Sequence, residues 1–164
     1  MKTNLQRIFL AACVCMLSFA ASAQSENPFI GTWDLDAAAS DFGGAPVPAT
    51  MIRTYADTGN GGYMYMILTI ADDGSIGGSG ASYRYDGVSV PIANMGAGTG
   101  AQNTISYFQV NGRTVEYTVR NNGRTTQIGA KTLDPASRVL TIVIQNINTD
   151  GGSSSSQILR FDRR

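Results

Sequence analysis

The strongest indication of the fold lies at residues 27–36, whose sequence is Asn-Pro-Phe-Ile-Gly-Thr-Trp-Asp-Leu-Asp. It contains the only tryptophan, Trp33, two residues after Gly31, and apolar and polar residues alternate from Trp33 onward. Such alternation is typical of a β-strand with one buried face. Beyond it the chain consists of short alternating runs joined by glycine-rich turns. We therefore expect a first strand here and an all-β domain after it.

The N-terminus has the pattern of a secretory signal peptide. Two cations in the first seven residues precede an apolar run over residues 8–20, and Ala-Ser-Ala follows. The run is shorter than the roughly 20 apolar residues that a membrane-spanning helix needs. We expect cleavage after Ala23, one domain over residues 24–164 and a periplasmic or extracellular location. Acylation of Cys13 in a lipoprotein is the less favoured alternative, because little apolar chain precedes it.

Composition limits the partners. The chain has 12 basic and 12 acidic residues without a basic stripe or a polybasic segment. Neither a nucleic-acid partner nor membrane insertion after signal cleavage is therefore expected. Both cysteines, Cys13 and Cys15, lie in the expected signal peptide, which leaves the exported domain without a disulfide. We expect a monomer held together by its core alone.

Histidine is absent from the sequence, which excludes Ser-His-Asp and Cys-His nucleophilic systems and the usual zinc sites. Two pairs of carboxylates, Asp34 with Asp36 and Asp72 with Asp73, remain as acid–base candidates. The first pair fits a solvated strand face, and the second fits a turn. We therefore assign no catalytic residue, no metal and no cofactor, and we do not expect an enzyme.

The second half of the chain contains two hairpin signals, Asn-Gly at 111–112 and Asn-Gly at 122–123. Counting outward from both turns gives one shared apolar face, whose members are Phe108, Val115, Tyr117, Val119 and Ile128. The next turn would place Val143 inward and leave three aliphatic residues on the outer face, which is unexpected: Leu140, Ile142 and Ile144. These strands predict a single antiparallel up-and-down β-barrel of about 8–10 strands.

These features resemble the lipocalin/calycin superfamily, and in particular the exported lipocalin-like proteins of bacteria. The likeness covers residues 27–162 and rests on four matches: residues 27–36, Asp41-Phe42, Tyr85-Asp86-Gly87 with Pro91, and an arginine in the last strand, Arg160. The resemblance implies that Gly31 and Trp33 open the first strand. It also implies that the indole closes one end of the barrel and that Arg160 packs over it.

The inward face of the barrel is the candidate for function. The residues expected to bind a ligand there are Tyr65, Met66, Phe108, Tyr117, Ile128 and Val143. Strand alternation lets either the tyrosines or the methionines of residues 63–66 point inward, and both remain open. An eight-stranded barrel is just wide enough to be packed by side chains or to hold one small ligand.

We expect the barrel to bind a small apolar or amphipathic molecule without catalysis. The loop over residues 95–101 would cover the ligand. The alternatives are a filled structural or interaction barrel and a small barrel isomerase or cyclase.

Overall fold

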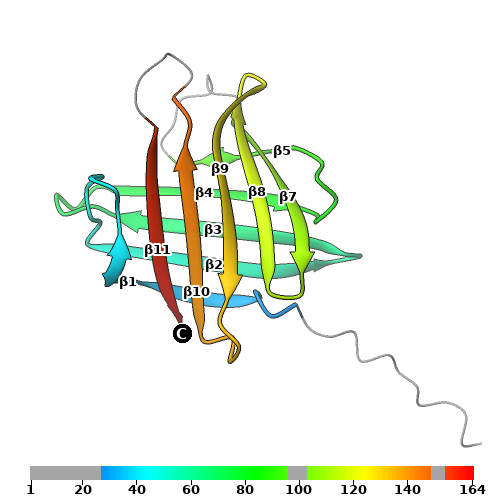
Figure 1. Cartoon of the computed structure of the whole chain (residues 1–164), viewed down its shortest axis with the longest axis horizontal. Coiled ribbons are helices and arrows are strands. Elements are labelled where there is room, and N and C mark those ends of the chain that lie inside the picture. The colour runs from blue at the N-terminus through cyan, green and yellow to red at the C-terminus, as the bar shows by residue number, and fades with distance from the viewer. Residues whose placement is uncertain (1–26, 96–102, 149–153) are drawn as a thin grey trace, which may run out of the picture.

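The computed structural model describes residues 27–95, 103–148 and 154–164. Their strands form one antiparallel sheet in the order β5-β7-β8-β9-β10-β11-β1-β2-β3-β4-β6 (Figure 1). The expected signal peptide over residues 1–23, and all but Met95 of the expected cover loop, lie outside these ranges. Within the described ranges no helix has the length and apolar character needed to cross a membrane.

Most of the described strands are long. They are β1 (Gly31–Asp41), β2 (Thr50–Gly59), β3 (Gly62–Ile70), β4 (Ile76–Tyr83), β7 (Asn103–Asn111), β8 (Thr114–Asn121), β9 (Arg124–Leu133), β10 (Val139–Asn146) and β11 (Ser155–Arg163). The other two described strands have two residues each: β5 (Val90–Pro91) and β6 (Ala93–Asn94).

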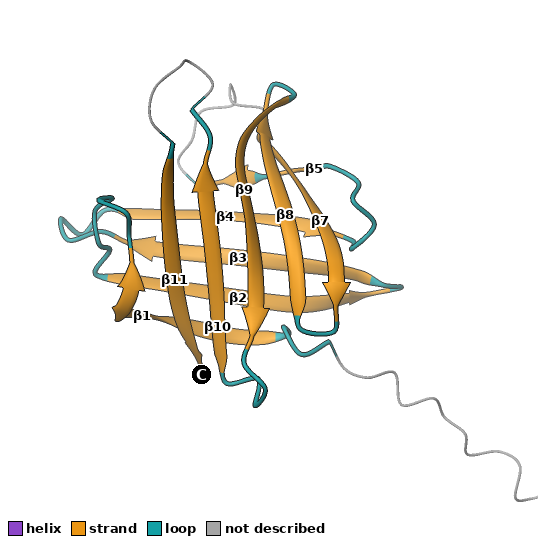
Figure 2. Ribbon diagram, viewed as in Figure 1, coloured by secondary structure: helices purple, strands orange, loops and turns teal. Residues whose placement is uncertain are grey.

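The strands lie in two crossed layers, with β1–β4 in one and β7–β11 in the other (Figure 2). The layers join where β1 pairs with both β2 and β11. On the opposite side the two short strands lie along the two edges, where β5 pairs with β7 and β6 pairs with β4. The result is a nearly closed barrel, so the predicted fold class is confirmed.

Two β-bulges reverse the strand faces that the sequence predicts for β7 and β9. Asn122 and Gly123 have φ values of 48° and 82°, as a type I′ turn requires. The register then shifts at Thr126, so that Tyr117 lies opposite Gly129 rather than Ile128. The other predicted turn, at Asn111-Gly112, is wrong by one residue, because Asn111 pairs with Thr114 and the turn lies at Gly112-Arg113. A second shift, at Val110, then places Gln109 opposite Val115. One extra residue turns every later side chain to the other face of its strand.

The predictions that Phe108, Ile128 and Val143 face inward are therefore wrong. Phe108 is 60% exposed on the outer surface of β7. Ile128 is likewise exposed on β9. Val143 of β10 is exposed as well, because it pairs with Ala130 of β9 and paired residues point to the same face of the sheet. The same shift explains the three aliphatic residues that had no place on a solvated face. They are buried in the core: Leu140, Ile142 and Ile144.

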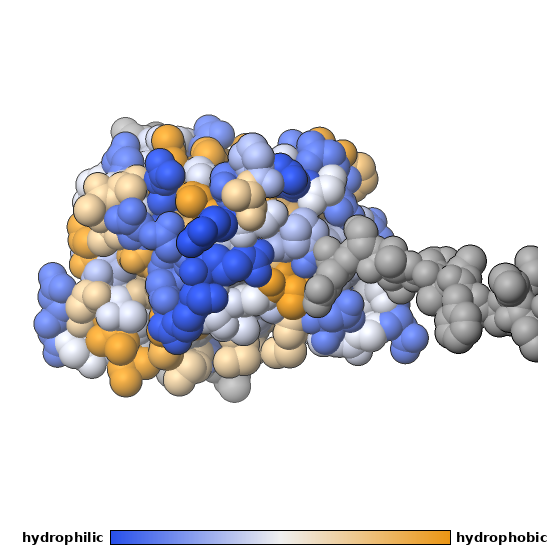
Figure 3. Space-filling model, turned by 90° about the horizontal axis from the view of Figure 1, so that it is seen from below, coloured by the Kyte–Doolittle hydropathy of each residue, from blue (hydrophilic) through white to orange (hydrophobic). Residues whose placement is uncertain are grey.

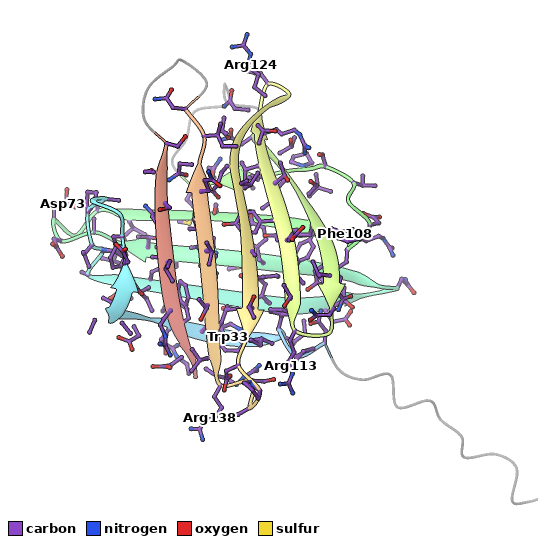
Figure 4. The ribbon with its side chains drawn as sticks, in the orientation of Figure 1. Trp33, Asp73, Phe108, Arg113, Arg124 and Arg138 are labelled. Carbon is purple, nitrogen blue, oxygen red and sulfur yellow. The ribbon has the colours of Figure 1, made fainter. Side chains whose placement is uncertain are left out.

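Trp33 lies fully buried at one end of the barrel, opposite the end that carries Arg124 (Figure 4). Its Nε1 donates a hydrogen bond to the carbonyl oxygen of Phe29 at 3.0 Å. The guanidinium of Arg163 lies 4.2 Å from the indole centroid and donates to the carbonyl oxygens of Pro28, Ile30 and Ser137. Seen from this end, the surface carries a band of hydrophilic residues (Figure 3).

The arginine over Trp33 is therefore Arg163, and the expectation for Arg160 is wrong. Trp33 is the direct cross-strand partner of Arg163, whereas Arg160 pairs with Asp36 and is exposed on the other face of β11. Gly31 is needed beside this contact. Its φ is +134°, and a Cβ there would lie 2.8 Å from an Arg163 nitrogen.

Arg163→Ala should lower the free energy of unfolding by about 1–3 kcal/mol, because it removes a cation–π contact and charge-assisted hydrogen bonds to three carbonyl groups. Arg160→Ala, on the same strand, is the matched control and should stay within about 0.5 kcal/mol of the parent protein. Urea denaturation of the three proteins measures both values. Equal effects of the two substitutions would contradict the assignment.

Candidate binding cavity

The barrel interior contains a cavity of about 220 Å³. Its wall is partly aliphatic and partly aromatic, with polar groups between. The aliphatic members are Ile67, Ile92, Ile105, Val119, Ile142 and Ile144, and the aromatic members are Tyr55, Tyr65, Tyr107 and Tyr117. The polar members are Arg53, Ser79, Asn94, Gln127 and Lys131. The cavity thus offers apolar burial together with a few convergent polar groups, as small-molecule sites do.

Arg53 brings a permanent positive charge to this wall. It lies on β2 opposite Trp33 and therefore points into the barrel. Its Nε is buried and has no hydrogen-bond partner in the described structure, and its guanidinium lies 5.1 Å from the centroid of the Phe161 ring. Within the described ranges no Asp or Glu is buried or lines the cavity. The guanidinium therefore has no acidic partner there.

Lys131 is the second basic residue of the interior and is only 1% exposed. Its Nζ lies within 6 Å of five aromatic ring centroids, at 4.2 Å from Tyr55, 4.8 Å from Phe29 and Tyr107, 5.3 Å from Tyr83 and 5.6 Å from Tyr85. We call these five residues the aromatic box. Nζ donates one hydrogen bond, to the Tyr83 hydroxyl at 3.3 Å. Burial lowers the pKa of Lys131 well below its ordinary value, and the charge of Arg53 acts in the same direction.

Tyrosines form most of the remaining interior. All seven tyrosines of the sequence lie in the core or against it. The tyrosine rings of β3, β4, β7 and β8 contact one another. Burial raises the pKa of Tyr65 to about 12, and it also raises the pKa values of Tyr83, Tyr107 and Tyr117. These hydroxyls therefore remain protonated at neutral pH and can donate hydrogen bonds.

Of the residues that we predicted from the sequence to bind a ligand, the structure places some in the cavity wall and others on the outer surface. Tyr65 and Tyr117 line the cavity. Phe108, Ile128 and Val143 lie on the outer surface. Met66 also lies on the outer surface, because strand alternation turns its neighbour Tyr65 inward. The Met66 side chain is 58% exposed and lines an outer groove with Leu68 and Met95. The prediction that these four side chains point into the barrel is therefore wrong.

Sequence reasoning missed both basic residues of the interior. The predicted inner face of β9 contained Ile128 and not Lys131, because the bulge at Thr126 was not recognised. A signal was present in composition, since Lys131 is one of only two lysines in the sequence and the other is Lys2. A strand that carries the only lysine of the expected domain, on the same face as Leu133, is a reason to consider a buried amine.

No family model matches the sequence, and no curated protein matches it either. Solved structures do match by fold. Wild-type UnaG, a fluorescent protein, aligns with a TM-score of 0.58 at 14% identity over 83% of this chain and 97% of that one. Rv2717c from M. tuberculosis aligns with a TM-score of 0.57 at 16% identity over 88% and 98%.

As-p18, an extracellular fatty acid binding protein, aligns with a TM-score of 0.52 at 13% identity over 84% of this chain and 97% of that one. At these identities the likeness concerns the fold alone. It shows an all-β, nearly closed antiparallel barrel, which is the fold class that the sequence predicted.

The buried amine predicts how stability depends on pH. The unfolded chain keeps the Lys131 proton up to its ordinary pKa of 10.5, whereas the folded protein releases it at lower pH. Between the two values the unfolded state binds more protons. The free energy of unfolding should therefore rise with pH, by at most about 1.4 kcal/mol per pH unit. Above about pH 10 it should fall, because buried tyrosines keep protons that the unfolded chain loses.

Urea denaturation between pH 6 and 11 measures this profile. Lys131→Met, which is similar in size and cannot be protonated, should lose the rising limb and keep the falling one. A parent profile that is flat below pH 10 would show that Lys131 titrates as an ordinary lysine.

Proposed function

We propose that this protein binds a small amphipathic anion, with an apolar or aromatic body and a carboxylate or similar acid group, inside the barrel. The observation that carries the proposal is the guanidinium of Arg53 on the cavity wall without an acidic partner in the described structure. A ligand acid would supply that partner.

The charge of Arg53 cannot be removed by deprotonation, because the guanidinium keeps its proton at any physiological pH. Arg53 is half-buried and its Nε is fully buried, and a charge that is partly removed from water without a counter-ion costs free energy. A carboxylate placed beside Arg53 would accept charge-assisted hydrogen bonds from its guanidinium, whose Nε has no partner in the described structure. The tyrosine hydroxyls of Tyr65 and Tyr117 could donate further bonds, and the aliphatic wall would cover the apolar body.

The size of the cavity favours a small ligand. Its volume of about 220 Å³ lies below the roughly 300–1,000 Å³ of sites for drug-sized molecules. A substituted benzoate fits this class better than a long-chain fatty acid does. The proposed ligand is therefore smaller than a long-chain fatty acid, whereas As-p18 is by its name a fatty acid binding protein.

We further propose that the protein acts outside the cytoplasm. The support is the N-terminal pattern of two cations, an apolar run over residues 8–20 and Ala21-Ser22-Ala23. In this location a non-catalytic barrel would sequester or carry its ligand. Mass spectrometry of the protein recovered from its own host would show whether the chain begins at Gln24, as this proposal requires.

Isothermal titration calorimetry with 4-methylbenzoate tests the binding proposal. Arg53→Gln should weaken binding by about 10- to 100-fold, because a charge-assisted hydrogen bond contributes about 1.5–3 kcal/mol. Arg160→Gln, an exposed arginine of β11, is the matched control and should bind like the parent. Circular dichroism checks that both variants keep the barrel.

Two results would overturn the proposal. Equal affinities of the parent and Arg53→Gln would show that the guanidinium does not hold the acid group. The absence of binding by 4-methylbenzoate and related small acids would leave a structural barrel as the better description.

A further inference from the structure

Lys131 has a chemical capacity that the binding of an anion does not use. It provides the only side-chain amine in the described part of the chain. It lies at the junction of the aromatic box and the cavity. Lys131, Tyr55 and Tyr107 belong to the cavity wall, whereas Phe29, Tyr83 and Tyr85 do not. The amine is thus enclosed by aromatic rings, and the side chain that carries it borders a space that a small ligand could enter.

The surroundings of Nζ suit a neutral amine better than an ammonium group. An ammonium has three donors to satisfy, and the structure gives this nitrogen one hydrogen bond, to Tyr83. Every charged or titratable group that borders it is a tyrosine or Arg53, and Arg53 repels a second positive charge. Ring faces attract a cation, but they do not replace the water or the carboxylate that a buried ammonium requires. A neutral amine keeps its lone pair available as a nucleophile.

We propose that Lys131 forms a reversible imine with an aldehyde or ketone carried by the ligand in the cavity. The inference rests on the proposed function, because it requires that small organic molecules enter the barrel. It adds that the ligand class includes carbonyl compounds and that one end of the bound molecule is held covalently. The acid group would face Arg53, and the carbonyl carbon would face Nζ.

The reaction balances without an added reagent. The Nζ lone pair attacks the carbonyl carbon and forms a C–N bond, which gives a carbinolamine after a proton moves from nitrogen to oxygen. Loss of the hydroxyl group as water, with the remaining proton taken from nitrogen, leaves the C=N bond. The Tyr83 hydroxyl, 3.3 Å from Nζ, is placed to relay these protons. Water is the only product besides the imine, and its addition reverses the reaction.

Two matched probes separate this inference from the function on which it rests. 4-Formylbenzoate carries both the acid and an aldehyde, and 4-methylbenzoate replaces the aldehyde with a methyl group of similar size. The protein is incubated with 4-formylbenzoate at pH 7.5 and reduced with borohydride, which converts an imine into a stable secondary amine. Intact mass and peptide mapping then locate the adduct. We expect one adduct, on the peptide containing Lys131.

Labelling of Lys131 should be at least about tenfold faster in the folded protein than in urea, because each unit of lowered pKa gives about ten times more neutral amine. 4-Methylbenzoate should compete with the labelling. Lys131→Arg, which keeps a basic side chain but cannot form the imine, should give no adduct at this position. Tyr83→Phe should slow labelling at Lys131 while 4-methylbenzoate still binds. The measurement on the parent protein stands by itself if either variant fails to fold.

The outcomes are distinct. Binding of 4-methylbenzoate without an adduct at Lys131 overturns the imine and leaves the proposed function in place. An adduct confined to the N-terminal amine also overturns it, and so does equal labelling of folded and unfolded protein. Failure of both probes to bind overturns the imine together with the proposed function.

Discussion

Two basic side chains point into a barrel whose described residues place no acid there, and the chemistry of the interior follows from this arrangement. Buried lysine and arginine are rare unless they are paired. The protein accommodates them differently. Lys131 lies among aromatic rings, and burial lowers the pKa of its amine, whereas Arg53 keeps its charge and has a buried Nε without a hydrogen-bond partner in the described structure. We therefore propose the first residue as a nucleophile and the second as the site for an anion.

The rest of the fold supports this interior. Trp33 and Arg163 close one end of the barrel, and the network of tyrosines fills the space next to it. The cavity occupies the remaining space, so the interior is neither wholly hollow nor wholly filled. Because tyrosine hydroxyls can donate hydrogen bonds where aliphatic groups cannot, this packing also supplies polar contacts without adding charge.

The sequence was sufficient to predict the barrel, the strand that begins at Gly31 and the turn at Asn122-Gly123, since these depend on local alternation and turn chemistry. It was insufficient for the strand faces of β7, β9 and β10, because single-residue bulges at Val110 and Thr126 leave no clear local pattern. Each bulge exchanged the inner and outer faces of its own strand, and the bulge at Thr126 is the reason why Lys131 of β9 was not expected in the interior. Arg53 was not predicted in the interior, because charged residues usually face water. Only the tertiary structure shows that this arginine is an exception.

The protonation state of Lys131 tests the account most directly. Carbon-13 labelling of lysine makes its Cε signal easy to follow by NMR, because the sequence contains only one other lysine, Lys2. We expect the Lys131 signal of the folded protein to have the chemical shift of a neutral amine at pH 8 and to move toward the ammonium value only at lower pH. A signal that remains that of an ammonium group until it titrates near pH 10.5, as in the unfolded chain, would contradict the account.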